Sequence, residues 1–302
     1  MKIAVSGASG MIGGTLVPAL RAAGHDVVVL VRRTPRTADE HRWDPQHHRI
    51  DPSLVRDVDG VVNLGGTPIR PRPFTAGYKE RLLTSRVDAT TTISEALAAA
   101  ATAEPGRPRV LLSASAVGYY GDTGSRTVTE EDPPGSDFLA QVCTQWEAAT
   151  APASDAGVRV VRLRTGLVLG RSAMLMQVLG TVFKVGLGGR MGNGRQYWPW
   201  ISLADEIGAM QHLLRTDVSG PVNLTGPAPA TNAEFTRELA RQVHRPAAIA
   251  VPGVAIKLAL GEFGRNSILA GQRALPVQLE NSGYRFVHPD LPSALGAALT
   301  KG

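Results

Sequence analysis

The 302 residues carry a formal net charge of +6, and 43% of them are hydrophobic and 19% charged. This balance excludes a disordered chain and is typical of a globular protein with a large buried core. The single cysteine, Cys143, excludes an intramolecular disulfide.

The positive charge alone does not indicate a nucleic-acid partner. The arginines are spread along the chain, without zinc-finger spacing or a compact basic run, so no nucleic-acid partner is expected. No apolar run approaches the roughly 18 residues of a membrane helix, so no membrane partner is expected either. A strand that begins at Lys2 leaves no signal-peptide pattern before it, which predicts a cytoplasmic location. Homodimerisation is left open.

The first 33 residues predict a dinucleotide site. An apolar strand over 2–6 is followed by glycines at positions 7, 10 and 13 and by a helical pattern. The first glycine allows a tight turn, the second lets the backbone approach a pyrophosphate, and the third lets the helix pack closely on the strand. Amide groups at the helix start would face the phosphates. The predicted cofactor-binding residues of this turn are Gly7, Ser9, Gly10, Met11, Ile12 and Gly13.

The second predicted strand, over 27–31, ends at Arg32 and Arg33. An acidic side chain at this point usually holds the ribose of a cofactor that lacks a 2′-phosphate. Two guanidinium groups favour the phosphate instead, since each charge-assisted hydrogen bond contributes about 1.5–3 kcal/mol. The sequence therefore predicts NADP(H) as the cofactor. The competing interpretation is that both arginines are solvated at a strand end.

Strands and helices alternate as far as about residue 170, which predicts an α/β fold with a doubly wound parallel sheet of the Rossmann type. The strand over 58–64 ends in glycines that let the backbone pass a ribose, so Leu64, Gly65 and Gly66 are further cofactor candidates. A helix is expected over about 76–101, in which Lys79, Arg81, Ser85 and Arg86 could face the site or water, with water as the default.

Two domains are predicted. Residues 1–226 form the NAD(P)-binding domain, with 170–212 contributing to the substrate side, and residues 227–302 form a smaller, mainly helical domain beside the substrate.

Several motifs resemble the extended short-chain dehydrogenase/reductases, the superfamily of nucleotide-sugar epimerases. They are the glycine turn, residues 63–66 (NLGG), 113–115 (SAS) with 119–121 (YYG), and 130–134 (EEDPP). Later motifs, at 186–189, 194–197, 200–205, 220–224 and 271–276, resemble atypical members of the NAD-dependent epimerase/dehydratase family that end in a small domain of unknown function. The resemblance implies an oxidoreductase or epimerase.

The superfamily's usual machinery is missing from its usual place. The resemblance implies a serine on the strand over 109–115, a tyrosine base and a lysine four residues after the tyrosine, on the same helix face. None of the five tyrosines has a lysine four residues later. Leu139 and Cys143 fall about where that tyrosine and lysine would be, and Cys143 is expected to be a buried apolar residue rather than a nucleophile.

A replacement catalytic set is Ser115 with Tyr119 or Tyr120, at the carboxyl end of a sheet strand where ligands bind. Ser115 would orient a substrate oxygen and one tyrosine would act as acid or base, with Ser113 as a cofactor contact on the same strand. Because a phenol without a lysine neighbour is a poor base at neutral pH, a packing role for both tyrosines is an equal alternative.

Residues 195–200 are expected to form a loop with four substrate candidates: Arg195, Gln196, Tyr197 and Trp200. Aromatic rings suit a sugar or ring face and arginine suits an anion, but a loop pinned into the core by its tryptophans is an equal alternative. No metal site is expected. We predict an NADP(H)-binding oxidoreductase or epimerase-like protein that acts on a small carbonyl or sugar-nucleotide-like substrate. The alternative is a non-catalytic NADPH-sensing regulator.

Overall fold

The computed structural model describes residues 1–186 and 188–300. Leu187, within the glycine-rich motif at 186–189, and the last two residues of the predicted C-terminal domain lie outside the described part. None of the described helices combines the length and the hydropathy that a bilayer span requires.

Seven parallel strands form the central sheet in the order β11-β7-β5-β4-β1-β2-β3. Their bounds are β1 (Lys2–Ser6), β2 (Asp26–Val31), β3 (Glu40–Arg42), β4 (Gly60–Asn63), β5 (Val110–Ala116), β7 (Arg159–Thr165) and β11 (Gly220–Leu224). The strand order reverses between β1 and β4, the point at which open α/β sheets bind ligands. The predicted doubly wound parallel sheet is confirmed.

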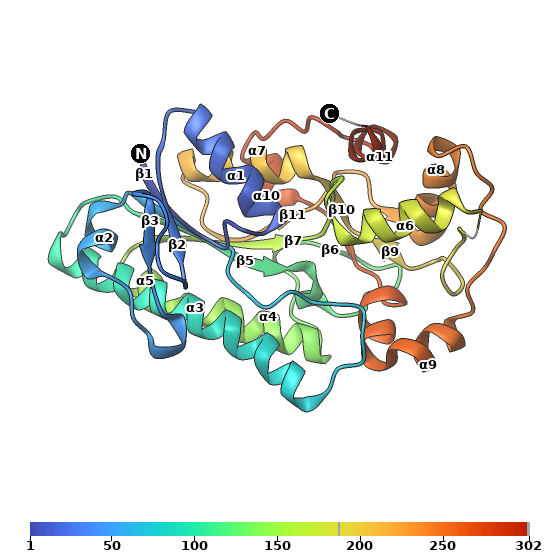
Figure 1. The fold of residues 1–302 in the computed structure, drawn as a ribbon, viewed down its shortest axis with the longest axis horizontal. Helices are drawn as coiled ribbons and strands as arrows, with labels where there is room; N and C mark the ends of the chain where they lie inside the picture. Colours follow the sequence, from blue (N-terminus) through green and yellow to red (C-terminus); the bar gives the residue numbers. More distant parts are fainter. Residues whose placement is uncertain (187, 301–302) are drawn as a thin grey trace.

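Helices cover both faces of this sheet (Figure 1). On one face lie α1 (Met11–Ala22) and α7 (Leu203–Arg215), and on the other lie α2 (Pro52–Asp57), α3 (Ala76–Ala103), α4 (Phe138–Ala148) and α5 (Ala151–Asp155). Adjacent residues of a strand enter different clusters: Val5 and Leu112 pack toward α1 and α7, and Ala4 and Leu111 toward α3. Double coverage explains why the central strands β1, β2, β4 and β5 are mostly apolar.

The remaining elements contain most of the second half of the chain, and α6, α8 and α9 gather at one end of the sheet (Figure 1). The helices are α6 (Met174–Lys184), α8 (Asn232–Gln242), α9 (Gly253–Phe263), α10 (Val277–Asn281) and α11 (Leu291–Leu299), with short helical turns η1 (Pro45–His47), η2 (Val117–Tyr120) and η3 (Gly264–Ile268). The short strands are β6 (Thr127–Val128), β8 (Leu167–Leu169), β9 (Tyr197–Trp198), β10 (Trp200–Ser202), β12 (Ala230–Thr231) and β13 (Arg273–Ala274).

The expectation that residues 195–200 form a loop is wrong for Tyr197, Trp198 and Trp200, which lie in strands. β9 pairs with β12 and β10 pairs with β8, so the aromatic run lies in two short two-stranded sheets. Aromatic side chains favour extended backbone when they can be buried on one face, and Trp198 and Trp200 are both buried.

Candidate functional site

The glycine turn joins β1 to α1 and has no room for a side chain at two of its glycines. Gly7 has a φ of +72°, and a Cβ there would lie 2.7 Å from the carbonyl oxygen of Leu64. A Cβ on Gly13 would lie 2.4 Å from the carbonyl oxygen of Gly7. Ser9 and Gly10, which precede α1, are exposed, and the first amide groups of a helix have no acceptor within it. The turn therefore fits a pyrophosphate, which would accept hydrogen bonds from these amides.

The two arginines after β2 have different surroundings. Arg33 donates to both carboxylate oxygens of Glu40, at 2.7 and 2.5 Å, and this pairing lowers the pKa of Glu40 to about 2. Arg32 is exposed and makes no hydrogen bond or ion pair with any residue in the described part. A 2′-phosphate at this strand end would meet a free guanidinium at Arg32, whereas Arg33 would first have to leave Glu40.

Ser6, which the sequence analysis did not single out, fixes the backbone after β4. Its hydroxyl donates to the Asn63 side-chain oxygen at 2.7 Å and accepts from the amides of Leu64 and Gly65 at 3.1 and 3.2 Å. Asn63 in turn donates to Thr90 of α3 at 2.9 Å. These bonds hold the predicted ribose-facing glycines beside the phosphate turn. The sequence signal that could have pointed to Ser6 was a polar residue directly after the apolar residues 3–5 of the strand.

Ser113 and Ser115 occupy alternate positions of β5 and both are buried. The Ser113 hydroxyl has no hydrogen-bond partner among the described residues. Ser115 donates to the Glu147 carboxylate of α4 at 2.7 Å. That carboxylate also accepts hydrogen bonds from Nε and Nη2 of Arg164, at 2.8 and 2.9 Å. Only a few per cent of either side chain of this ion pair is exposed. Burial alone would lower the pKa of Arg164, but Glu147 outweighs it and the pKa is raised.

The two adjacent tyrosines differ in what their hydroxyl groups contact. Tyr120 is 3% exposed, donates to Asn223 at 2.7 Å and accepts from Nη1 of Arg164 at 3.0 Å. Burial raises the pKa of Tyr120 to about 12 despite that neighbouring cation. Tyr119 is half-buried, with the Arg164 guanidinium 3.5 Å from its ring centre and no hydrogen bond from its hydroxyl to a described residue. Tyr119 is therefore the tyrosine with a free phenol group.

The face of α4 that the resemblance assigns to the missing tyrosine and lysine does lie against the end of β5. A Cβ on Gly118 would contact Leu139 at 3.8 Å and the Cys143 sulfur at 3.9 Å. Cys143 is fully buried, and burial raises the pKa of its thiol to about 12. As expected, this cysteine is a buried residue, and its thiol stays protonated at neutral pH.

The expectation that Arg86 faces water is wrong. Only 8% of this α3 residue is exposed, and its Nη1 donates to the carbonyl oxygens of Thr67 and Leu82 at 3.0 and 2.9 Å. The position lies on the buried side of α3, between Leu82 and Ala89. The spacing of apolar residues along α3 did not indicate that Arg86 is buried, because Thr90, Thr92 and Ser94 on the buried side of the helix are polar too.

Two of the four substrate candidates use their polar atoms to hold the backbone. Gln196 donates from its amide to the carbonyl oxygens of Met191 and Ile268, and Trp200, 1% exposed, donates to that of Ala228 at 3.0 Å. Arg195 is exposed. Tyr197 is half-buried, with the Arg273 guanidinium 5.1 Å from its ring centre.

Glu206, at the start of α7, is a second buried acid near the strand ends. One carboxylate oxygen accepts from Thr165 at 2.9 Å, and the other has no partner among the described residues. Burial raises the pKa of Glu206 to about 8. The folded protein therefore keeps this group protonated at a pH where an unfolded glutamate, with a pKa of 4.5, is ionised.

We expect Glu206→Gln to stabilise the protein at alkaline pH. Glu206 lowers the free energy of unfolding of the native protein as the pH rises from about 4.5 to 8, because in that range the unfolded state releases the Glu206 proton and the folded state keeps it. Gln removes the effect, so the free energy of unfolding should rise by about 2–4 kcal/mol at pH 8 and by much less at pH 4. Urea unfolding at both pH values measures this, and an equal change at the two would contradict it.

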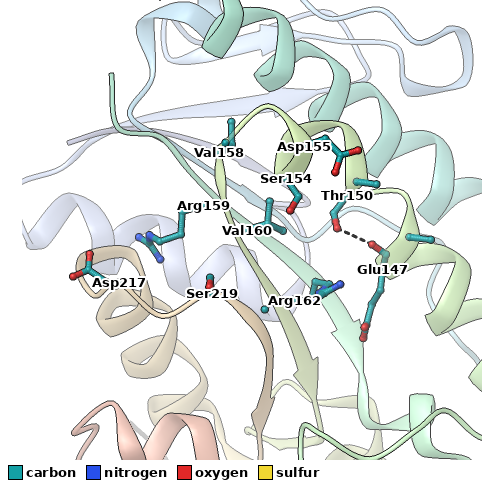
Figure 2. A pocket seen from close by; sticks show the side chains of 14 residues that line it. Glu147, Thr150, Ser154, Asp155, Val158, Arg159, Val160, Arg162, Asp217 and Ser219 are labelled. Atoms are coloured by element: carbon teal, nitrogen blue, oxygen red, sulfur yellow. Dashed lines mark hydrogen bonds between the residues drawn. The ribbon is translucent and has the colours of Figure 1, made fainter. Parts of the chain in front are cut away.

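A hollow of about 680 Å³ lies beside the start of β7 and β11, and Glu147 is among the residues that line it (Figure 2). Arg159, Arg162 and Asp217 line it, together with the end of α4 and residues of α5. These are the amino ends of the strands, whereas the glycine turn, Ser115 and the tyrosines lie at the carboxyl ends. The hollow thus lies at the opposite ends of the strands from the predicted site.

The chain is similar to known proteins along nearly its whole length. The sequence model of the NAD dependent epimerase/dehydratase family matches residues 3–225, and that of a domain of unknown function, DUF1731, matches residues 251–298. The chain is 47% identical over 300 residues to the epimerase family protein Mb2239 of Mycobacterium bovis, with 99% of this chain and 98% of the relative covered.

Two solved structures are also similar. Human epimerase family protein SDR39U1, crystallised with NADPH, gives a TM-score of 0.86 at 30% identity, with 99% of both chains covered. The nucleoside-diphosphate sugar epimerase from Corynebacterium glutamicum gives 0.80 at 34% identity, with 99% of this chain and 58% of that chain covered.

Proposed function

Since the chain belongs to the NAD dependent epimerase/dehydratase family, we propose that it binds NADP(H) and acts as an oxidoreductase or epimerase on a small carbonyl or sugar-nucleotide-like substrate. The observation that carries the proposal is the turn in which Gly7 and Gly13 exclude any Cβ, followed by a free arginine at the end of β2. The NADPH in the human SDR39U1 structure and the name of the Corynebacterium relative support the cofactor and the substrate class.

The residues of the turn would hold the pyrophosphate, Arg32 the 2′-phosphate, and the backbone of Leu64–Gly66 the ribose. Bound NADP(H) supplies hydride chemistry. The chain must then supply a group that orients the substrate oxygen and one that moves its proton. The Ser115 hydroxyl donates its hydrogen bond to Glu147, so the Ser115 oxygen can accept a hydrogen bond from a substrate hydroxyl.

Tyr119 is our candidate for the proton-transfer group, because its hydroxyl is free while that of Tyr120 is committed to Asn223 and Arg164. The stacked Arg164 guanidinium would stabilise negative charge on a neighbouring phenolate or substrate oxygen. In this proposal Tyr120 holds the ends of β7 and β11 in place and takes no part in proton transfer.

We expect Tyr119→Phe to lower kcat by about a hundredfold or more, the usual loss when an acid–base group is removed. Tyr120→Phe is the matched control: it should keep kcat within a few-fold and lower the free energy of unfolding by about 1–3 kcal/mol, because Asn223 loses its buried donor. NADPH oxidation with a panel of carbonyl compounds and sugar nucleotides measures both. The reverse pattern would assign the role to Tyr120.

A non-catalytic NADPH sensor is the second candidate function, favoured by Leu139 and Cys143 at the positions of the missing pair. The same panel separates the two. Binding of NADPH without oxidation by any compound would support the sensor, and carbonyl-dependent oxidation lost on Tyr119→Phe would exclude it.

We also propose that residues 227–302 form the substrate-side domain and that 170–212 contribute to it. Residues 271–275 reach back over the loop that follows β5: Gln272 donates to the Gly121 carbonyl oxygen at 2.7 Å, and β13 pairs with β6. The Leu275 carbonyl oxygen accepts from Asn223 at 2.9 Å. These contacts support a C-terminal segment that closes the site beside Tyr119.

A further inference from the structure

Arg86 is a buried cation without a buried anion. It has 8% of its surface exposed and forms no ion pair with any carboxylate in the described part of the chain. Its nearest aromatic neighbour is Trp146, whose ring centre lies 5.0 Å from the guanidinium carbon. A guanidinium stays protonated in proteins, and an unpaired buried charge costs several kcal/mol of stability. The fold thus maintains an unfavourable charge at this position.

Three of the five N–H groups of the guanidinium are unused. Nη1 donates to two backbone carbonyl oxygens, of Thr67 and Leu82. Nε and Nη2 make no hydrogen bond with a described residue, yet neither is among the polar atoms that are fully enclosed without a partner. These two groups therefore keep donors that a ligand can reach.

The position of Arg86 follows from the chain after β4. Leu64 lies against Gly7 of the phosphate turn, and two residues later a Cβ on Gly66 would lie 3.2 Å from Cγ and 3.4 Å from Cζ of Arg86. Two residues span at most about 7 Å. In the sheet, β2, which leads to Arg32, and β4, which leads to Leu64–Gly66, lie on opposite sides of β1. Arg86 lies on the β4 side, beside Trp146 of α4. A dinucleotide with its pyrophosphate on the turn would extend its nicotinamide half in this direction.

We propose that Arg86 is a cofactor-binding residue whose Nε and Nη2 groups donate to a ribose or phosphate oxygen in the nicotinamide half of the dinucleotide. The inference rests on the proposed NADP(H) function and assigns a cation beside α4, the helix on which the resemblance places the missing lysine. It also agrees with Gly66, because any larger residue would require the Arg86 side chain to shift by a few tenths of an ångström.

The test is titration of the full chain with NADPH and with 2′,5′-ADP, which contains only the adenosine half and its phosphates. Arg86→Met keeps an unbranched apolar side chain and removes the charge, and Arg86→Lys restores a charge. Arg81→Met is the matched control, since Arg81 is an exposed cation on the same helix. Thermal unfolding of each variant verifies that it is folded.

We expect Arg86→Met to weaken NADPH binding by about tenfold to a hundredfold and to leave 2′,5′-ADP binding within about twofold. Arg86→Lys should recover part of the loss, and Arg81→Met should bind both compounds as the wild type does. Unchanged NADPH binding by Arg86→Met, or an equal loss for both compounds, would overturn the inference. A wild-type protein that binds neither compound would instead contradict the proposed function, and with it the ligand assigned to Arg86.

Discussion

Glu147→Gln should lower the free energy of unfolding by about 3–5 kcal/mol, because it leaves the buried guanidinium of Arg164 without its carboxylate. The same substitution weakens the acceptor of the Ser115 hydroxyl and loosens the arginine that contacts both tyrosines. At roughly 2–4 °C per kcal/mol for a large domain, the unfolding midpoint should fall by about 6–20 °C.

Glu238→Gln provides the control, since Glu238 pairs with an Arg241 side chain that is 67% exposed. Exposed pairs contribute about 1 kcal/mol or less, so its midpoint should move little. The double variant Glu147→Leu/Arg164→Met should recover part of the loss, because it removes both buried charges together. An unchanged midpoint for Glu147→Gln would show that the pair does not hold β5, β7 and α4 together.

Gly13→Ala should weaken NADPH binding by about tenfold to a hundredfold. The added Cβ would lie 2.4 Å from the Gly7 carbonyl oxygen and 2.7 Å from Cα of Ala8, so α1 must move away from the turn that it closes. Forcing one methyl group into such a contact costs about 1–3 kcal/mol, and here the displaced atoms are those that would hold the pyrophosphate. Titration with NADPH measures the loss.

Gly14→Ala is the matched control on the next residue of the same helix. Its added Cβ would make one ordinary contact, 3.5 Å from the Ala8 carbonyl oxygen, and alanine favours a helix more than glycine does. We expect unchanged NADPH binding and equal or higher stability. Equal affinities for Gly13→Ala and Gly14→Ala would mean that the turn does not hold the cofactor.

The fold and the cofactor turn could be predicted because their signals are local. Strand patterns, the spacing of Gly7, Gly10 and Gly13, and two arginines at a strand end lie within 33 residues, and the sheet order and the close contacts of the glycines agree with them.

The interior of the site could not be predicted, because its contacts join distant parts of the chain. Glu147 and Arg164 carry no sequence sign that they pair, and Tyr120 reaches Asn223, 103 residues away. Water was the default orientation for Arg86 because it is a charged residue of a helix, and the polar residues on the buried side of α3 left no sign in the sequence that it is buried. Tertiary contacts decide where these polar groups lie, and periodicity does not report them.

The dissociation constants of NADPH and NADH test the central claim most directly. The free guanidinium of Arg32 predicts that NADPH binds about tenfold to a hundredfold more tightly than NADH, and that Arg32→Ala removes most of this difference. Equal dissociation constants for the two cofactors in the wild-type protein would contradict the account.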